Sequence, residues 1–186
     1  MRRSRSQLRW GPLIALLVVA AGCGDSPESK TSKAAPAPAN APSYQATLEE
    51  GIDFRRDGVP TFISEVTGLS GREPFGRWSD ANLGPSVRVV FREPLPRKFE
   101  VALTALVMDQ NEKLPVLVRA GGVEQSVSFE KPGTLQTQTI VFDLPQDTNT
   151  MEIVAPKPVA PHALDPKNQD QRQLGIALTS LRIRKL

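Results

Sequence analysis

Cysteine, histidine and aromatic residues are scarce in this chain of 186 residues. It has one cysteine, one histidine and 5% aromatic residues. A single cysteine cannot close a disulfide within the chain, and one cysteine with one histidine cannot supply the usual ligands of a zinc site. No apolar run after the first two dozen residues approaches the ~20 residues of a membrane-spanning helix. We therefore expect no metal and no cofactor.

The amino-terminal segment has the layout of a secretory signal. Four arginines come first: Arg2, Arg3, Arg5 and Arg9. The apolar stretch 11–21 follows, and it is too short to span a bilayer as a helix. It ends in Val19-Ala-Ala-Gly-Cys23, which resembles the bacterial lipobox. That resemblance implies a signal peptide over residues 1–22 and lipidation of Cys23, including an acyl chain such as palmitate. An ordinary secretory signal with an incidental cysteine is the alternative.

Removal of residues 1–22 changes the charge of the protein. The whole chain has a net charge of +3, and the loss of four arginines leaves −1. Nucleic-acid binding needs a clustered basic face, so this charge predicts no nucleic-acid partner. Gly24 follows Cys23 where an aspartate would retain a lipoprotein in the inner membrane. We therefore expect a lipid-anchored protein of the bacterial cell envelope that faces the periplasm. The outer membrane is favoured over the inner membrane as the place of the anchor.

Composition divides the rest of the chain into a tether and a domain. Residues 23–47 hold the lipidated cysteine and a stretch rich in Ser, Pro and Ala, which includes Ala34-Ala-Pro-Ala-Pro-Ala-Asn-Ala-Pro42. Such a stretch cannot bury a core, so we interpret it as a disordered tether. Residues 48–186 have the composition of one globular domain.

The domain has the residue alternation of β-strands. Phe99, Val101, Leu103, Ala105 and Val107 share one parity, as in a strand with one buried face. Gly121-Gly122 separates two apolar runs, which predicts a two-residue hairpin. A change of parity near Thr179-Ser180 predicts a bulge. Further strands are predicted at 52–54, 61–67, 87–91, 137–143, 150–154 and 174–183. About eight short strands predict an all-β, antiparallel, jelly-roll-like β-sandwich.

The segment Gly68–Asp80 departs from this alternation and is predicted to be a loop. It gathers side chains suited to a sugar ligand: Arg72, Glu73, Arg77, Trp78 and Asp80. An aromatic plane suits the C–H face of a sugar ring, and planar charged groups form paired hydrogen bonds with hydroxyls. In the structural alternative, Trp78 closes one end of the core while Arg77 and Asp80 pair to hold the loop.

A second unusual segment, residues 155–173, is long, polar and rich in proline. It either folds over one end of the sandwich and completes a groove beside Trp78, or it is a solvated excursion.

Several motifs resemble one accessory domain. They are Ile52-Asp-Phe54, Gly68-Leu-Ser-Gly-Arg-Glu-Pro-Phe-Gly-Arg-Trp-Ser-Asp-Ala-Asn82, Val87-Arg-Val-Val-Phe91 with Pro94-Leu-Pro96, and Leu174-Gly-Ile-Ala-Leu-Thr-Ser-Leu-Arg-Ile183. The resemblance is to the uncharacterised carboxy-terminal β-domain of phosphoglycerol transferases that modify periplasmic glucans, and of some membrane glycosyltransferases. It covers nearly all of residues 50–186 and does not include the separate catalytic domain of those proteins. It therefore implies a glycan-related module without its enzyme.

Catalytic and metal-binding alternatives find little support in the sequence. His162 and Asp165 could join Ser64 or Ser70 in a triad, but no Gly-x-Ser-x-Gly elbow accompanies them. Glu73 and Asp80 are the best candidates for a carboxylate pair. Asp80, Asn82 and Asp143 could bind calcium, although no characteristic spacing links them.

Two functions follow from the sequence. The first is a non-catalytic, carbohydrate-binding-like accessory module that recognises an envelope glycan or a glycan-modifying enzyme. The second is a structural lipoprotein that docks a protein partner of the envelope.

Overall fold

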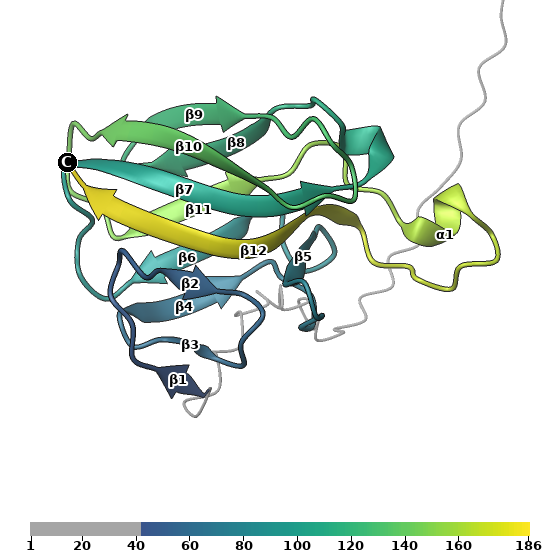
Figure 1. Cartoon of the computed structure of the whole chain (residues 1–186), viewed down its shortest axis with the longest axis horizontal. Coiled ribbons are helices and arrows are strands. Elements are labelled where there is room, and N and C mark those ends of the chain that lie inside the picture. The colour runs from purple at the N-terminus through teal and green to yellow at the C-terminus, as the bar shows by residue number, and fades with distance from the viewer. Residues whose placement is uncertain (1–41) are drawn as a thin grey trace, which may run out of the picture. The chain divides into compact units, whose positions relative to one another are not determined.

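The strands predicted from alternating apolar residues are present in the computed structural model, which describes residues 42–186 (Figure 1). The predicted signal, the lipidation at Cys23 and most of the tether lie outside the described residues. The described strands are β1 (Ser43–Tyr44), β2 (Ile52–Asp53), β3 (Val59–Pro60), β4 (Ile63–Thr67), β5 (Arg77–Asp80), β6 (Val87–Phe91), β7 (Lys98–Val107), β8 (Val116–Ala120), β9 (Val123–Val127), β10 (Gln136–Asp143), β11 (Thr150–Val154) and β12 (Leu174–Lys185). Two short helical turns accompany them, η1 (Asp109–Asn111) and α1 (Pro161–Leu164).

Two five-stranded sheets face each other across the core. One has the order β10-β7-β12-β2, with β5 also pairing with β12, and the other has the order β4-β6-β11-β8-β9. The small strands β1 and β3 form a separate parallel pair. The prediction of an all-β sandwich is confirmed.

The strand pairing is that of a jelly roll. Four antiparallel pairs are nested in the chain: β8 with β9, β7 with β10, β6 with β11, and β2 with β12. The nested pairs roll up, so that β7 also meets β12 and β8 also meets β11. These eight strands correspond to the predicted number; β4 also lies within a predicted range, whereas β1, β3 and β5 were not predicted.

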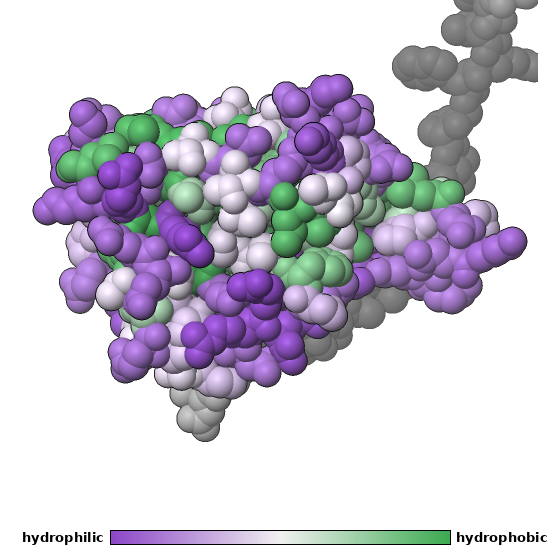
Figure 2. Space-filling view, viewed as in Figure 1, coloured by the Kyte–Doolittle hydropathy of each residue, from purple (hydrophilic) through white to green (hydrophobic). Residues whose placement is uncertain are grey.

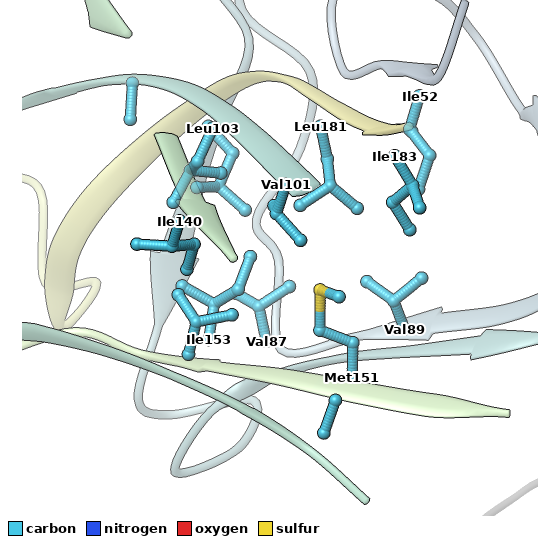
Figure 3. Packing of buried hydrophobic residues seen from close by; sticks show 14 of the residues in the cluster. Ile52, Val87, Val89, Val101, Leu103, Ile140, Met151, Ile153, Leu181 and Ile183 are labelled. Carbon is cyan, nitrogen blue, oxygen red and sulfur yellow. The ribbon is translucent and has the colours of Figure 1, made fainter. Parts of the chain in front are cut away.

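The core lies between the inner faces of the two sheets. In β7, alternate residues from Phe99 to Val107 are at most 1% exposed. Figure 3 shows Val101 and Leu103 of this strand opposite Val87 and Ile153 of the other sheet. Each such side chain contributes about 1.5–3 kcal/mol by leaving water. Alternation with period two is thus the reason why these segments form strands.

The turn and the bulge occur where the sequence predicts them. Gly121 and Gly122 have φ angles of 55° and 83°, the left-handed conformations that a two-residue hairpin needs at both positions. The register of β12 against β7 shifts between Leu178 and Ser180. This bulge lets the apolar residues on both sides of it point into the same core.

Two features differ from the sequence-based expectations. Residues Arg77–Asp80, predicted to belong to a loop, form strand β5 on the side of β12. Regular structure already begins at Ser43, within the stretch interpreted as a tether. Near the end of that stretch, Thr47 and Glu50 hold a turn by reciprocal hydrogen bonds of the capping-box type: the Thr47 N–H donates to Glu50 Oε2 at 2.7 Å, and the Glu50 N–H donates to Thr47 Oγ1 at 3.2 Å.

Candidate binding site beside Trp78

Strand β5 places Trp78 on the outer face of its sheet. Trp78 lies opposite Ala177 of β12, which in turn lies opposite Leu106 of β7. Together with Leu174, Phe75 and Met108, these residues form a second apolar cluster, separate from the main core. Phe75 contacts the indole ring edge to face, with 6.0 Å between the ring centroids.

Trp78 is largely covered in this cluster. Its residue is 8% exposed, so most of the indole surface is in contact with protein. The prediction that it closes an end of the main core is wrong, because the ring packs outside the sandwich. Its predicted role as a ligand platform remains a hypothesis, and the exposed part of the ring faces a groove.

Asp80 and Arg77 have separate structural roles and do not pair with each other. Asp80 is 4% exposed, and its Oδ1 accepts the backbone N–H groups of Asn82 and Gln173, both at 3.0 Å. Arg77 donates to the carbonyl oxygen of Arg56 at 3.4 Å. The expectation that Arg77 and Asp80 form a pair that holds the loop is therefore wrong. Asp80 holds the segment by its hydrogen bonds to the backbone.

Arg172 joins the two unusual segments of the chain. Its guanidinium donates to Glu73 Oε1 at 3.0 Å and to Ser70 Oγ at 3.1 Å. It also donates to both carboxylate oxygens of Asp170, at 2.6 to 3.1 Å. These hydrogen bonds lower the pKa of Asp170 and raise the pKa of Arg172. The remaining predicted residue, Arg72, pairs with Asp57 at 2.8 Å on the surface.

The segment 155–173, which contains α1, projects from one end of the sandwich beyond the start of β12 (Figure 1). Val159 bridges to Leu174, and His162 Nδ1 lies 2.7 Å from the carbonyl oxygen of Asn168. Helix α1 brings Leu164 to the edge of the second cluster. Leu164 thus lines a groove beside Trp78, as in one of the two predicted arrangements, whereas residues 163–169 are exposed, as in the other.

The groove is shallow and mostly apolar, with a volume of about 350 Å³. Its walls come from β5, the end of β7, the turn η1 and α1; they are Trp78, Leu106, Val107, Met108, Asp109, Gln110, Gly133 and Leu164. Figure 2 views the outer face of the sheet formed by β10, β7 and β12, where pale and green residues occupy the middle and hydrophilic residues the margins. Carbon surface can thus receive a ligand here, with Asp109 and Gln110 as polar groups beside it.

Leu106, Met108 and Leu164 are groove residues that the sequence-based list lacks. Leu106 did carry a signal, because it is a large apolar residue on the outward parity of β7. The position of Met108 and Leu164 in the groove is known only from the tertiary fold.

The groups considered for catalysis have other bonding partners. Ser70 Oγ accepts from Arg172, Ser64 Oγ donates to the carbonyl oxygen of Val90, and Asp165 accepts from the Lys167 N–H. Glu73 binds Arg172, whereas Asp80 binds backbone. Within residues 42–186 no group of three or more His, Cys, Asp or Glu residues could hold a metal ion. Nor does this part of the chain contain a helix long and apolar enough to cross a membrane.

Fold and site define a class of protein: a jelly-roll domain with an apolar groove on the outside of one sheet. The chain belongs to the family described as "Domain of unknown function (DUF7024)", whose model matches residues 38–185. It is also 35% identical over 130 residues to proteins named phosphoglycerol transferase I of Escherichia coli O157:H7 and Shigella boydii serotype 18. The match covers 70% of this chain and 17% of those relatives. The resemblance expected from the motifs is confirmed.

Proposed function

We propose that this protein is a non-catalytic accessory module of the bacterial envelope that recognises a glycan through the groove beside Trp78. The observation that carries the proposal is the shared domain: 130 residues match phosphoglycerol transferase I, yet they make up only 17% of that protein. A domain that makes up so small a part of a transferase is suited to recognition, which needs no reacting groups of its own.

The groove supports a sugar ligand by its chemistry. The carbon surfaces of Trp78, Leu106 and Leu164 suit the C–H face of a sugar ring. Asp109 and Gln110 lie beside them and offer acceptors and donors for hydroxyl groups. Arg72 and Glu73, which the sequence also suggested, hold neighbouring segments through Asp57 and Arg172. Their proposed role is therefore to fix the walls of the site.

The proposed location is the periplasmic face of the envelope, with lipid on Cys23 as the anchor. One acyl chain holds a protein only marginally, whereas two or three hold it stably. The outer membrane is the proposed destination because Gly24 follows Cys23. The partners would then be an envelope glycan and the membrane.

Leu164→Asp provides the sharpest test of the groove, because Leu164 is 55% exposed and its replacement spares the core. We expect Leu164→Asp to weaken the binding of linear or cyclic glucans by about tenfold, equivalent to about 1.4 kcal/mol. Isothermal titration calorimetry on the purified chain measures this affinity. Leu83→Asp is the matched control, since Leu83 is 59% exposed and does not line the groove.

Equal glucan affinities for wild type and Leu164→Asp, with both folded by circular dichroism, would contradict recognition through the groove. The apolar lining also favours a second candidate, the docking of a protein partner. In that case crosslinking in whole envelopes would capture one protein with wild type and lose it with Leu164→Asp, while no glucan bound.

A further inference from the structure

We propose that the domain has a second binding site, for a neutral polyhydroxylated ligand of the size of one or two sugar units, at the β8–β9 hairpin. The site is a hollow of about 420 Å³ beside the turn and the start of β11. This volume lies within the range of small-molecule sites. The inference goes beyond the groove at Trp78, because it concerns the other sheet and other residues.

The hollow exists because three consecutive residues lack bulky side chains. Ala120, Gly121 and Gly122 are among the residues that line it. The positive φ angles of the two glycines turn the chain from β8 into β9. At Gly122 an added Cβ would have only the Gln146 amide nitrogen near it, at 4.0 Å. The turn chemistry of the hairpin thus also leaves room for a ligand.

Polar side chains from three strands and one loop line this space. On the outer face of the sheet, Arg88, Glu152, Arg119 and Glu124 lie in one row across neighbouring strands. Arg119 pairs with Glu124 at 2.6 Å, and Arg88 pairs with Glu65 at 3.3 Å. Glu152 lies between the two arginines and takes part in no ion pair among residues 42–186. Its carboxylate therefore keeps acceptor capacity within the hollow.

The other wall supplies neutral groups. Gln146 lies in the β10–β11 loop, and Thr148 and Thr150 follow it. The two threonines are held in place, because the Thr150 N–H donates to Thr148 Oγ1 at 3.2 Å. An amide has two donors and an acceptor, and a carboxylate has two acceptor oxygens.

This combination suits vicinal hydroxyl groups better than a charged ligand. Hydroxyls can donate to Glu152 and accept from the Gln146 amide at the same time. The Arg119–Glu124 pair adds no net charge, so the Glu152 carboxylate makes the lining negative and disfavours an anion. Arg88 and Arg119, which lie on either side of Glu152, disfavour a small cation at this carboxylate. A saccharide presents the required hydroxyls on adjacent carbons, which is why we assign it as the ligand class.

The second site is far from the Trp78 groove. Gly121 lies near Leu144, whose N–H binds the carbonyl oxygen of Arg97 just before β7 begins. The groove contains Leu106 and Met108 at the other end of β7. At ~3.3 Å per residue, the two sites are roughly 30 Å apart along this strand. A single sugar unit cannot touch both, so the two can be tested separately.

The test is a titration of the full chain with glucose and with a short linear β-glucan, followed by amide chemical shifts and by tryptophan fluorescence. In a Trp10→Phe background, Trp78 is the only tryptophan, so its emission reports on the groove alone. We expect the amides of Gly121, Gly122 and Thr150 to shift, and Glu152→Gln to weaken this binding by about tenfold or more. Glu100→Gln is the matched control, since Glu100 lies on the other sheet and pairs with Arg184.

Saccharide that shifts these amides without changing Trp78 emission would support the hairpin site even if the groove bound nothing. Saccharide that changes only Trp78 emission would overturn the hairpin site and leave the proposed function standing. Unchanged affinity in Glu152→Gln, or no binding by wild type at all, would also overturn the hairpin site.

Discussion

Individual side chains near Trp78 stabilise the fold through bonds to the backbone. Asp80 is the clearest case, since one carboxylate oxygen accepts N–H groups from two segments that are about ninety residues apart in sequence. Removing such an acceptor leaves two backbone donors without their partner, at a cost of about 1–3 kcal/mol for a buried group. Residues that suggest ligand binding by composition can therefore owe their presence to the fold.

Asp80→Ala is expected to lower the free energy of unfolding by about 2 kcal/mol, because the N–H groups of Asn82 and Gln173 lose their acceptor. Asp80→Asn keeps an oxygen in the same place and should lose less than half as much. Urea unfolding monitored by circular dichroism measures both. Equal losses in the two variants would show that the negative charge, and not the acceptor geometry, stabilises this junction.

At the scale of elements, the segment 155–173 is held by few contacts. It has one short helix, one isolated bridge and the Arg172 hydrogen bonds. Asn111 adds a contact from η1: its Nδ2 donates to the carbonyl oxygens of Pro156 and Lys157, while its buried Oδ1 has no partner within the described chain. The wall of the groove that contains Leu164 depends on these polar contacts.

Acidification is expected to weaken this part of the structure through Asp170. Hydrogen bonds from Arg172 hold the pKa of Asp170 below its ordinary value of 3.8. A lowered pKa in the folded state means that the ionised carboxylate adds stability above about pH 3.8, which is lost as the pH falls toward the folded-state pKa. The direction of the effect is therefore destabilisation by acid.

Urea unfolding of wild type and Asp170→Asn at pH 6 and at pH 3 measures this contribution. We expect wild type to be more stable than the variant at pH 6 and the difference to shrink at pH 3. A difference of the same size at both pH values would mean that ionisation of Asp170 adds nothing. Asp147→Asn is the control, since Asp147 binds Arg97 at the surface, with 74% of its side chain exposed.

At the scale of the whole molecule, the nested pairs join the beginning of the domain to its end. Ile52 of β2 lies opposite Leu181 of β12, and the Ile183 N–H binds the carbonyl oxygen of Leu48. Pairs this distant in sequence pay a loop-closure entropy before they contribute any stability. The domain is thus closed by its last strand, whose two faces serve the main core and the Trp78 cluster.

Attachment to the membrane is expected to depend on lipidation of Cys23 and not on the β-domain. Cys23→Ser is expected to move the protein from the membrane fraction to the soluble fraction, because no acyl chain can then be added. Fractionation with radioactive palmitate labelling measures this outcome. Ser26→Ala should remain membrane-bound and labelled, whereas membrane association of Cys23→Ser would contradict lipid anchoring.

The sequence by itself determined every described strand except β1, β3 and β5, together with the hairpin and the bulge. Their signals are local: apolar residues with period two in β7, two glycines at 121 and 122, and a change of parity near Thr179-Ser180. The jelly-roll-like sandwich also followed from the number of short strands, whereas the pairing of the strands did not. The ligand-binding role assigned from the sequence to Arg72, Glu73, Arg77, Trp78 and Asp80 stays a prediction, and none of their observed contacts was foreseen.

Tertiary structure alone decided that residues 77–80 form β5, that Trp78 lies outside the main core, and that Leu164 completes the groove. The sequence of a strand indicates which of its faces is apolar, but it does not indicate which distant segment covers that face. Ala177 and Leu106 lie some seventy residues apart in sequence, and only the pairing of β12 with β7 brings them together beneath Trp78. The hairpin hollow follows the same rule, since Gln146 and Glu152 reach Gly122 only through the pairing of β8 with β11.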